Sequence, residues 1–438
     1  MVYEDYSIMG LLDKGNIKQW RYKVSKLTFK FPGFGNLDIN PERVKYIQII
    51  EDYTKNIFPI LRMHVVLEPS TYYRVLKEKN GVQITLKMQK YYQKPDSATK
   101  YGPYDFLSDV FQLVMNDNTE DLLHAQKLSN NKSDYTRSAR DDRNDLQQVD
   151  NTLEFFMFKM ASLNAAKASN VNAILTKATV TDALAYLFSK TKLLNNVILG
   201  PPDNNTLYEY ILLPPLSVLK SILYLDTYYG LYQTGSMIYF GIDYTYIIPY
   251  SANDRIYASS EKVRKIKIIV PSTDNVKDMT ILGELSRSGE NTYYIIADYR
   301  SVDIMNNSIA NNYIEANDAQ VVDSYTGEVN TNNSSATSIG GNFLRLLENK
   351  SENKFVGSTY TAQTSSDSIV VKFVLQDIDA KMITPNKEYS IEFDDAAYAN
   401  KYKGTYLIVN SLQTYTNTGD GFYCTIEVTL KRTGFVKQ

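Results

Sequence analysis

The amino-acid sequence, 438 residues long, predicts a β-rich α+β protein. Segments toward both ends of the chain alternate apolar and polar residues with a period of two, as half-solvated antiparallel strands do. The stretch 106–235 carries helical periodicity instead. Hydrophobic residues make up 43% of the chain and charged residues 22%, which is typical of a globular protein and not of a disordered one.

The first hundred residues are expected to form an antiparallel sheet or small barrel. Three strands are predicted at 24–31, 43–50 and 60–68. A fourth, at 82–88, alternates cleanly, and the turn dipeptide Asn80-Gly81 before it indicates a hairpin that pairs 72–78 with 82–90.

The next region is expected to be mostly helical. Its charged part, 116–150, is interpreted as a solvated helix face or loop. Helical spacing then starts at Leu153 and continues through the alanines of 161–168. A second helix is predicted over 180–188, with Thr181 or Asp182 as its N-cap. A third is expected to open at Pro214 and Pro215 and to end at Gly230, where a left-handed cap fits.

Strand patterns return in the last two hundred residues, around an Asn/Ser/Thr-rich stretch (306–340) that indicates a long polar loop. Strands are predicted at 236–249, 263–270, 292–299, 319–323, 368–375, 404–412 and 422–432, and a short helix at 342–349. We therefore expect a barrel-like β domain (1–105), a mostly helical α/β insertion (106–235), a second β region (236–325), a polar linker with a short helix (326–365) and C-terminal strands that complete a barrel (366–438).

The scarcity of histidine and cysteine excludes several kinds of site. His64, His124 and Cys424 are the whole supply, so a Cys/His zinc site and an intramolecular disulfide cannot form, and histidine-based triads are nearly excluded. The sequence also lacks a phosphate-binding glycine loop and the common hydrolase motifs. Both histidines are expected to be structural or exposed, and Cys424 to act as a small buried hydrophobe.

Carboxylates are the remaining candidates for catalysis. Asp394-Asp395 and Asp141-Asp142 are adjacent pairs, but neighbours on a strand point to opposite faces. Asp377 and Asp379 could hold calcium, although their spacing is not that of an EF-hand. We therefore predict no catalytic, cofactor-binding or metal-binding residue and no cofactor, and the chain is not expected to be an enzyme.

Tyrosine is unusually frequent, with 36 copies against 17 phenylalanines and one tryptophan. Large, partly wet subunit interfaces favour tyrosine, and so does a coding sequence of low GC content; both explanations stay open.

The N-terminus has neither the basic nor the apolar region of a signal peptide, and the apolar run 211–225 is too short and too interrupted to span a membrane. The formal net charge of −2 gives no indication of a nucleic-acid surface.

Three segments together resemble one protein family. YIQIIEDYTKNIFPILRMHVVLE (46–68) resembles the opening of the baseplate hub proteins of contractile and related phage tails, a family that includes the hub part of type VI secretion spike proteins. YEYILLPPLSVLKSILYLDTYYGLYQTGSMIYFGIDYTYIIP (208–249) is similar to the family's proline-led helix and the strand that returns toward the first barrel. KYKGTYLIVNSLQTYTNTGDGFYCTIEVTLKR (401–432) resembles its closing strands, except that Leu412-Gln413 stand where a histidine is usual.

The resemblance implies a structural virion protein of the tail baseplate, assembled in the host cytoplasm. With two barrel-like antiparallel domains per subunit, a homotrimer would form a ring of six barrels. This ring would lie between the hexameric tail tube or its initiator and a trimeric central spike, with wedge proteins around it. DNA would pass through without specific binding, and the loop 323–341 would order on assembly. The alternative is a tail-associated cell-wall hydrolase or carbohydrate-binding protein, which clustered aromatics with a carboxylate pair in one groove would favour.

Overall fold

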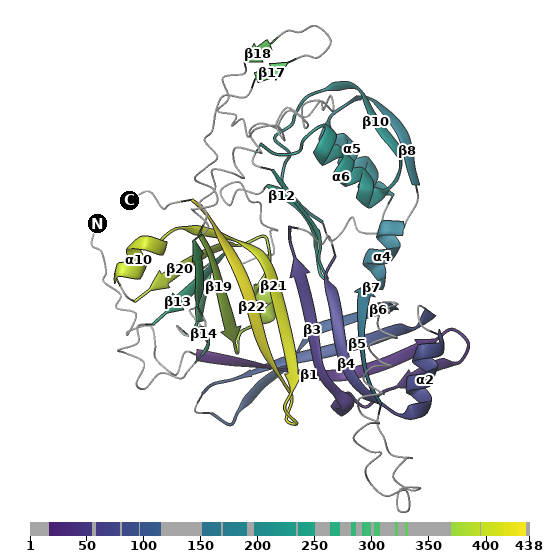
Figure 1. Ribbon diagram of the computed structural model, residues 1–438, viewed down its shortest axis with the longest axis vertical. Coiled ribbons are helices and arrows are strands. Elements are labelled where there is room, and N and C mark those ends of the chain that lie inside the picture. Colours follow the sequence, from purple (N-terminus) through teal and green to yellow (C-terminus); the bar gives the residue numbers. More distant parts are fainter. Residues whose placement is uncertain are drawn as a thin grey trace, which may run out of the picture.

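The chain folds around one large, curved β-sheet (Figure 1). The computed structural model describes residues 17–54, 58–78, 81–95, 97–114, 151–167, 170–190, 197–233, 235–249, 263–271, 282–285, 291–298, 302–306, 320–322, 329–331, 369–394 and 396–434. Strands dominate these residues, so the molecule is the β-rich α+β protein that the sequence predicts.

Eight antiparallel strands close into a first ring. In spatial order they are β21 (Thr405–Asn417), β3 (Val44–Asp52), β4 (Ile60–Leu67), β7 (Asn151–Lys159), β6 (Lys100–Val114), β5 (Gln83–Gln93), β1 (Ile17–Phe31) and β22 (Phe422–Gly434). The ring closes because β22 pairs with β21 along most of its length and meets β1 at the ladder pair Tyr22↔Phe422. Closure leaves no free edge among these strands.

A second ring shares the wall formed by β1, β22 and β21. It continues from β21 through β20 (Glu388–Phe393), β13 (Lys265–Val270), β15 (Thr292–Ile296) and β14 (Gly283–Leu285), and β14 pairs back onto the start of β1. Unlike the first ring it is mixed, because β13 runs parallel to both β15 and β20. β19 (Ile369–Gln376) and β16 (Asp303–Asn306) extend the sheet from β22, and β2 (Gly35–Asp38) pairs with the end of β1.

Period-two alternation places the side chains as predicted. On β5, Ile84, Leu86 and Met88 are buried while Lys87 is exposed. On β22, the buried side chains from Cys424 to Leu430 alternate with exposed or half-buried ones. The buried residues of both rings belong to one continuous hydrophobic core.

A separate α/β lobe lies above the rings in Figure 1. It contains the two-stranded ribbon of β8 (Asn170–Ala178) and β10 (Tyr208–Ser217), helices α5 (Val180–Ser189) and α6 (Val218–Tyr228), and the three-stranded sheet of β9 (Val197–Leu199), β12 (Thr245–Pro249) and β11 (Ser236–Phe240). These elements share their own hydrophobic core, and α4 (Met160–Lys167) leads into the lobe from β7. Among the described residues, no helix is both long and apolar enough to cross a bilayer.

Two predicted elements have the wrong type. The segment expected to pair with 82–90 is helix α2 (Pro69–Glu78), and β5 pairs with β1 and β6 instead. The helix expected from Leu153 is strand β7 up to Lys159, and only the alanine-containing part beyond it is helical. The helical part of the expected insertion is therefore smaller than predicted, because β6 and β7 belong to the first ring.

The predicted helix ends are partly right. Pro214 and Pro215 do not open a helix; they lie in β10, where its register with β8 shifts, and α6 starts after Ser217, whose hydroxyl accepts from the Lys220 amide at 3.4 Å. The end at Gly230 is confirmed, with a φ of +76°. For α5 the N-cap is Thr179, two or three residues earlier than expected.

The polar stretch expected as a loop contains a small hairpin, β17 (Gln320–Val322) with β18 (Val329–Thr331). The remaining short elements are α10 (Ala396–Tyr402) and the 3₁₀ turns η2 (Pro41–Arg43) and η9 (Ala380–Met382). The charged segment 116–150, the helix at 342–349, His124, Asp141, Asp142 and Asp395 lie outside the described residues.

Candidate functional site

The histidine and cysteine that can be placed have structural surroundings. His64 lies half-buried on β4, its ring centroid 5.0 Å from that of Tyr46, and burial lowers its pKa. Cys424 is buried on β22, and burial raises the pKa of its thiol, which keeps it protonated and unreactive. Neither residue lines the pocket described below.

Asp377 and Asp379 pair with cationic side chains of the protein itself. Asp377 forms an ion pair with Arg21 and Asp379 one with Lys90. Each carboxylate therefore already has a counter-charge, and within the described part of the chain no three metal-ligating side chains come together. The calcium site considered from the sequence finds no support in this arrangement.

The loop that carries these aspartates joins the two rings through buried hydrogen bonds. The Tyr22 hydroxyl donates to the Ile378 carbonyl at 3.0 Å and accepts from the Ala380 amide at 2.9 Å. The Asp379 amide donates to the Tyr293 hydroxyl at 3.0 Å, and that hydroxyl donates to Glu284. We call this set of contacts, together with the Lys90–Asp379 pair, the junction network.

The junction network also surrounds the single tryptophan. The Trp20 indole N–H donates to Glu284, and the Lys90 ammonium lies 4.8 Å from the centroid of the Trp20 ring. Because β5 of the first ring and β14 and β15 of the second ring all contribute, movement of one ring against the other would break buried polar contacts.

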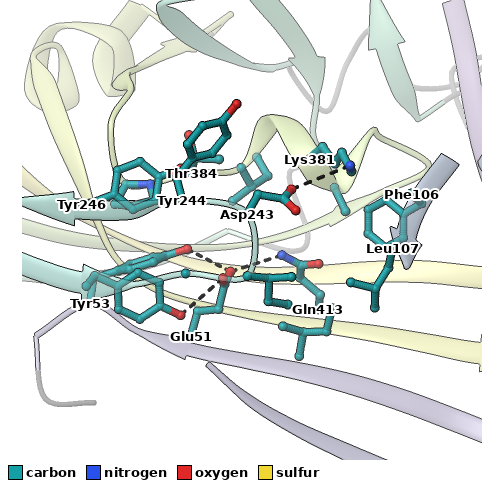
Figure 2. Close-up of a pocket in the computed structure, with 17 residues that line it drawn as sticks. Glu51, Tyr53, Phe106, Leu107, Asp243, Tyr244, Tyr246, Lys381, Thr384 and Gln413 are labelled. Atoms are coloured by element: carbon teal, nitrogen blue, oxygen red, sulfur yellow. Dashed lines mark hydrogen bonds and ion pairs between the residues drawn. The ribbon is translucent and has the colours of Figure 1, made fainter. Parts of the chain in front are cut away.

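A pocket near this loop has a volume of about 490 Å³ (Figure 2). That size falls in the range of ligand-binding pockets. Its walls come from β3, β6, the turn between β11 and β12, β21 and the loop 380–385, and most of its side chains are aromatic or aliphatic. The aromatic ones are Tyr53, Phe106, Tyr239, Tyr244 and Tyr246.

Glu51 is the buried carboxylate of this pocket. Its Oε2 accepts from the Tyr53 hydroxyl and the Ser411 hydroxyl, both at 2.9 Å, and from the Gln413 amide at 3.3 Å. Its Oε1 accepts from the Tyr239 hydroxyl at 3.3 Å. Burial raises the pKa of Glu51, and the hydrogen bonds to the charged form only partly oppose that effect.

A second carboxylate, Asp243, lies in the same pocket. It faces Lys381, whose ammonium is 3.7 Å away, and Lys381 is also 5.8 Å from the centroid of the Phe106 ring. Figure 2 shows this ion pair above Glu51. The hydroxyl oxygen of Thr384, another lining residue, is buried without a hydrogen-bond partner among the described residues.

Reasoning from the sequence did not find Glu51 or Asp243. Tyr239 is 188 residues and Ser411 360 residues from Glu51 in the sequence, so no local spacing marks the cluster. The aspartates that the sequence suggested stand out only because they lie close together in the sequence. In the structure Asp377 and Asp379 are ion-pair partners of Arg21 and Lys90, and the Asp394 amide donates to the Val270 carbonyl.

An exposed apolar face covers the outer side of the β8–β10 ribbon. It consists of Ile174, Tyr210 and Leu212 on the two strands and of Leu207 immediately before β10, with exposed fractions of 63%, 65%, 47% and 65%. Ile174 and Leu212 are directly opposite in the ladder, and their neighbours Ile211 and Leu213 point inward onto the lobe's core. We call these four residues the ribbon face. Exposed apolar residues on a two-stranded ribbon are typical of an interaction surface.

Comparison with known proteins gives one family and several similar folds. The family described as "Bacteriophage PBS1 gene 109 protein" matches residues 29–433. Comparison with curated proteins gives no match.

Solved structures to which this chain is similar include a tail protein from Neisseria meningitidis MC58, with 9% identity and a TM-score of 0.44 over 93% of this chain and 96% of that one. The 43 kDa tail protein of prophage MuSo2 from Shewanella oneidensis has 10% identity and a TM-score of 0.39, over 92% and 97%. An E. coli component of the type VI secretion system has 9% identity and a TM-score of 0.39, over 95% and 79%.

Proposed function

We propose that this chain, which belongs to the family of the bacteriophage PBS1 gene 109 protein, is a structural protein of the phage tail. The family membership agrees with the phage origin that the sequence resemblance implies. Within the tail we assign it to the hub, as a homotrimer in the baseplate that joins the hexameric tube or its initiator to the central spike, with wedge proteins around it.

The double ring carries this proposal. Each subunit contains two closed β rings fused through β1, β22 and β21, so three subunits would present six ring units to a hexameric tube. The junction network supports the role because it fixes the two rings of one subunit relative to each other. A protein that matches threefold to sixfold symmetry needs that rigidity.

The ribbon face is our candidate for a contact between subunits. Its four residues expose apolar surface on and beside a two-stranded ribbon, and a neighbouring subunit would bury that surface. The formal net charge of −2 also suits a channel for DNA, because a strongly basic lining would bind the phosphates.

The alternative, a cell-wall hydrolase or carbohydrate-binding protein, gains one observation. Glu51 and Asp243 place two carboxylates in one aromatic-lined pocket. Their partners oppose a catalytic role, because three donors hold one oxygen of Glu51 and Lys381 pairs with Asp243. A general acid must present its proton to the substrate, so we propose a non-enzymatic role.

Native mass spectrometry tests the proposal. We expect the wild-type chain to form a species of three times 50.0 kDa. The double variant Ile174→Lys, Leu212→Glu should be monomeric but folded, because the opposite charges face each other across the ladder and preserve the hairpin. Tyr73→Asp, at an exposed position of α2, is the matched control and should stay trimeric. A wild-type chain that stays monomeric with its tail partners present would contradict the hub assignment.

A further inference from the structure

The buried carboxylate of Glu51 has no cationic partner among the described residues. Only hydroxyl and amide groups donate to it, and among the residues that the structure describes no lysine or arginine forms an ion pair with it. Lys381 is used by Asp243. A carboxylate that is 9% exposed is stabilised in its charged form by a nearby cation, so a cationic ligand would favour the ionised form of Glu51.

Two oxygen atoms of the residues that line this pocket can each accept a further hydrogen bond. Oε1 of Glu51 accepts a single hydrogen bond, at 3.3 Å, although a carboxylate oxygen can accept two. The hydroxyl oxygen of Thr384 lies in the pocket wall without a hydrogen-bond partner in the described structure. A ligand with several N–H donors could use both.

The pocket walls suit a cation on an apolar stem. Tyr53, Tyr239, Tyr244 and Tyr246 line the same pocket as Glu51, and aromatic faces attract cations. Lys381 already places an ammonium near Phe106, which shows that a cation is accommodated at this wall. The ionised pocket carries two carboxylates against one ammonium.

We propose that this pocket binds the side chain of an arginine from a partner protein, with the guanidinium against Glu51 and the alkyl stem between the tyrosines. A guanidinium matches the site better than an ammonium because it is planar, weakly hydrated, stacks on aromatic rings and offers five donors. The partner is thus identified by charge complementarity, and the proposal goes beyond the hub assignment and does not depend on it.

Saturation-transfer NMR on the full chain tests this with two probes of the same shape. N-acetyl-arginine amide is the cation, and N-acetyl-citrulline amide replaces the guanidinium by an uncharged urea. We expect the arginine probe to bind about tenfold more tightly. Glu51→Gln should abolish the preference. Tyr244→Ala, at an exposed position where folding is safe, and Thr384→Val should each weaken binding about threefold to tenfold.

Tyr73→Ala is the matched control, an exposed tyrosine on α2 outside the pocket, and should bind as the wild type does. Equal binding of both probes, or equal effects of Tyr244→Ala and Tyr73→Ala, would overturn the proposal. Spermidine binding more tightly than the arginine probe would assign the pocket to free polyamines. Competition by tri-N-acetylchitotriose would assign it to saccharides. Native mass spectra of the same samples report trimer formation separately, so failure here and failure of the hub assignment are distinguishable.

Discussion

Replacement of Lys90 by methionine tests the junction network. Lys90 and Asp379 are both almost buried, with 10% and 4% of their side chains exposed. Methionine keeps most of the apolar stem against Trp20 but removes the ammonium, so Asp379 is left as a buried carboxylate without its cation. Breaking one side of a buried ion pair costs about 3–5 kcal/mol, and we expect a loss of that size in the free energy of unfolding.

The structure offers a matched control. Lys265 and Glu388 also form an ion pair, at 3.5 Å, but 58% and 28% of their side chains are exposed. Exposed pairs contribute about 0–1 kcal/mol, so Lys265→Met should change stability little. The double variant Lys90→Met, Asp379→Asn should recover part of the loss, because it also removes the unpaired charge.

The assay is guanidinium unfolding at a fixed protein concentration, followed by the fluorescence of Trp20. This tryptophan is the only one in the chain and lies inside the junction network, so its signal reports on the perturbed region directly. If Lys90→Met destabilised the protein no more than Lys265→Met, the claim that the network fixes the two rings would be refuted.

Three further changes probe other parts of the molecule. Burial raises the pKa of Glu51, so the folded chain holds this proton more tightly than the unfolded chain does. The free energy of unfolding of the wild type should therefore fall as the pH rises above the ordinary pKa of 4.5 and level off above the folded pKa. The denaturant midpoint of Glu51→Gln should depend less on pH over the same range. Val428→Asp would bury an unpaired charge at a position that is 1% exposed and cost about 4 kcal/mol or more, so it should yield insoluble protein while Glu427→Gln next to it stays soluble. His64→Gln should leave tail assembly intact in an infectivity assay, and a complete loss of infectivity with normal folding would support an enzymatic role instead.

The strands could be predicted from the sequence wherever one face is buried and the other is wet. β5 and β22 were found with the correct inward residues for that reason. The helix α2 was missed because Asn80-Gly81 suggested a hairpin, while Pro69 at its first position and the buried pair Tyr72 and Val75 at helical spacing were the better signal.

β7 shows the ambiguity of short apolar runs. Leu153, Phe155 and Met157 are buried with a period of two, yet Leu153 and Phe156 also match helical spacing. Pairing with β4 and β6 decided the outcome, and that information is not local. The pocket could not be predicted for the same reason, since Glu51 obtains its partners from β11 and β21 far along the chain.

The shared wall also determines when the protein can fold during synthesis. β1 starts at Ile17, but both rings close only through β22, which ends at Gly434. At about 5–20 residues per second, β1 leaves the ribosome tens of seconds before its closing partner is made. Throughout that interval the early strands have unsatisfied edges and no completed barrel. A truncated chain can therefore close neither ring, so a product without its last strands would be excluded from assembly by its own misfolding.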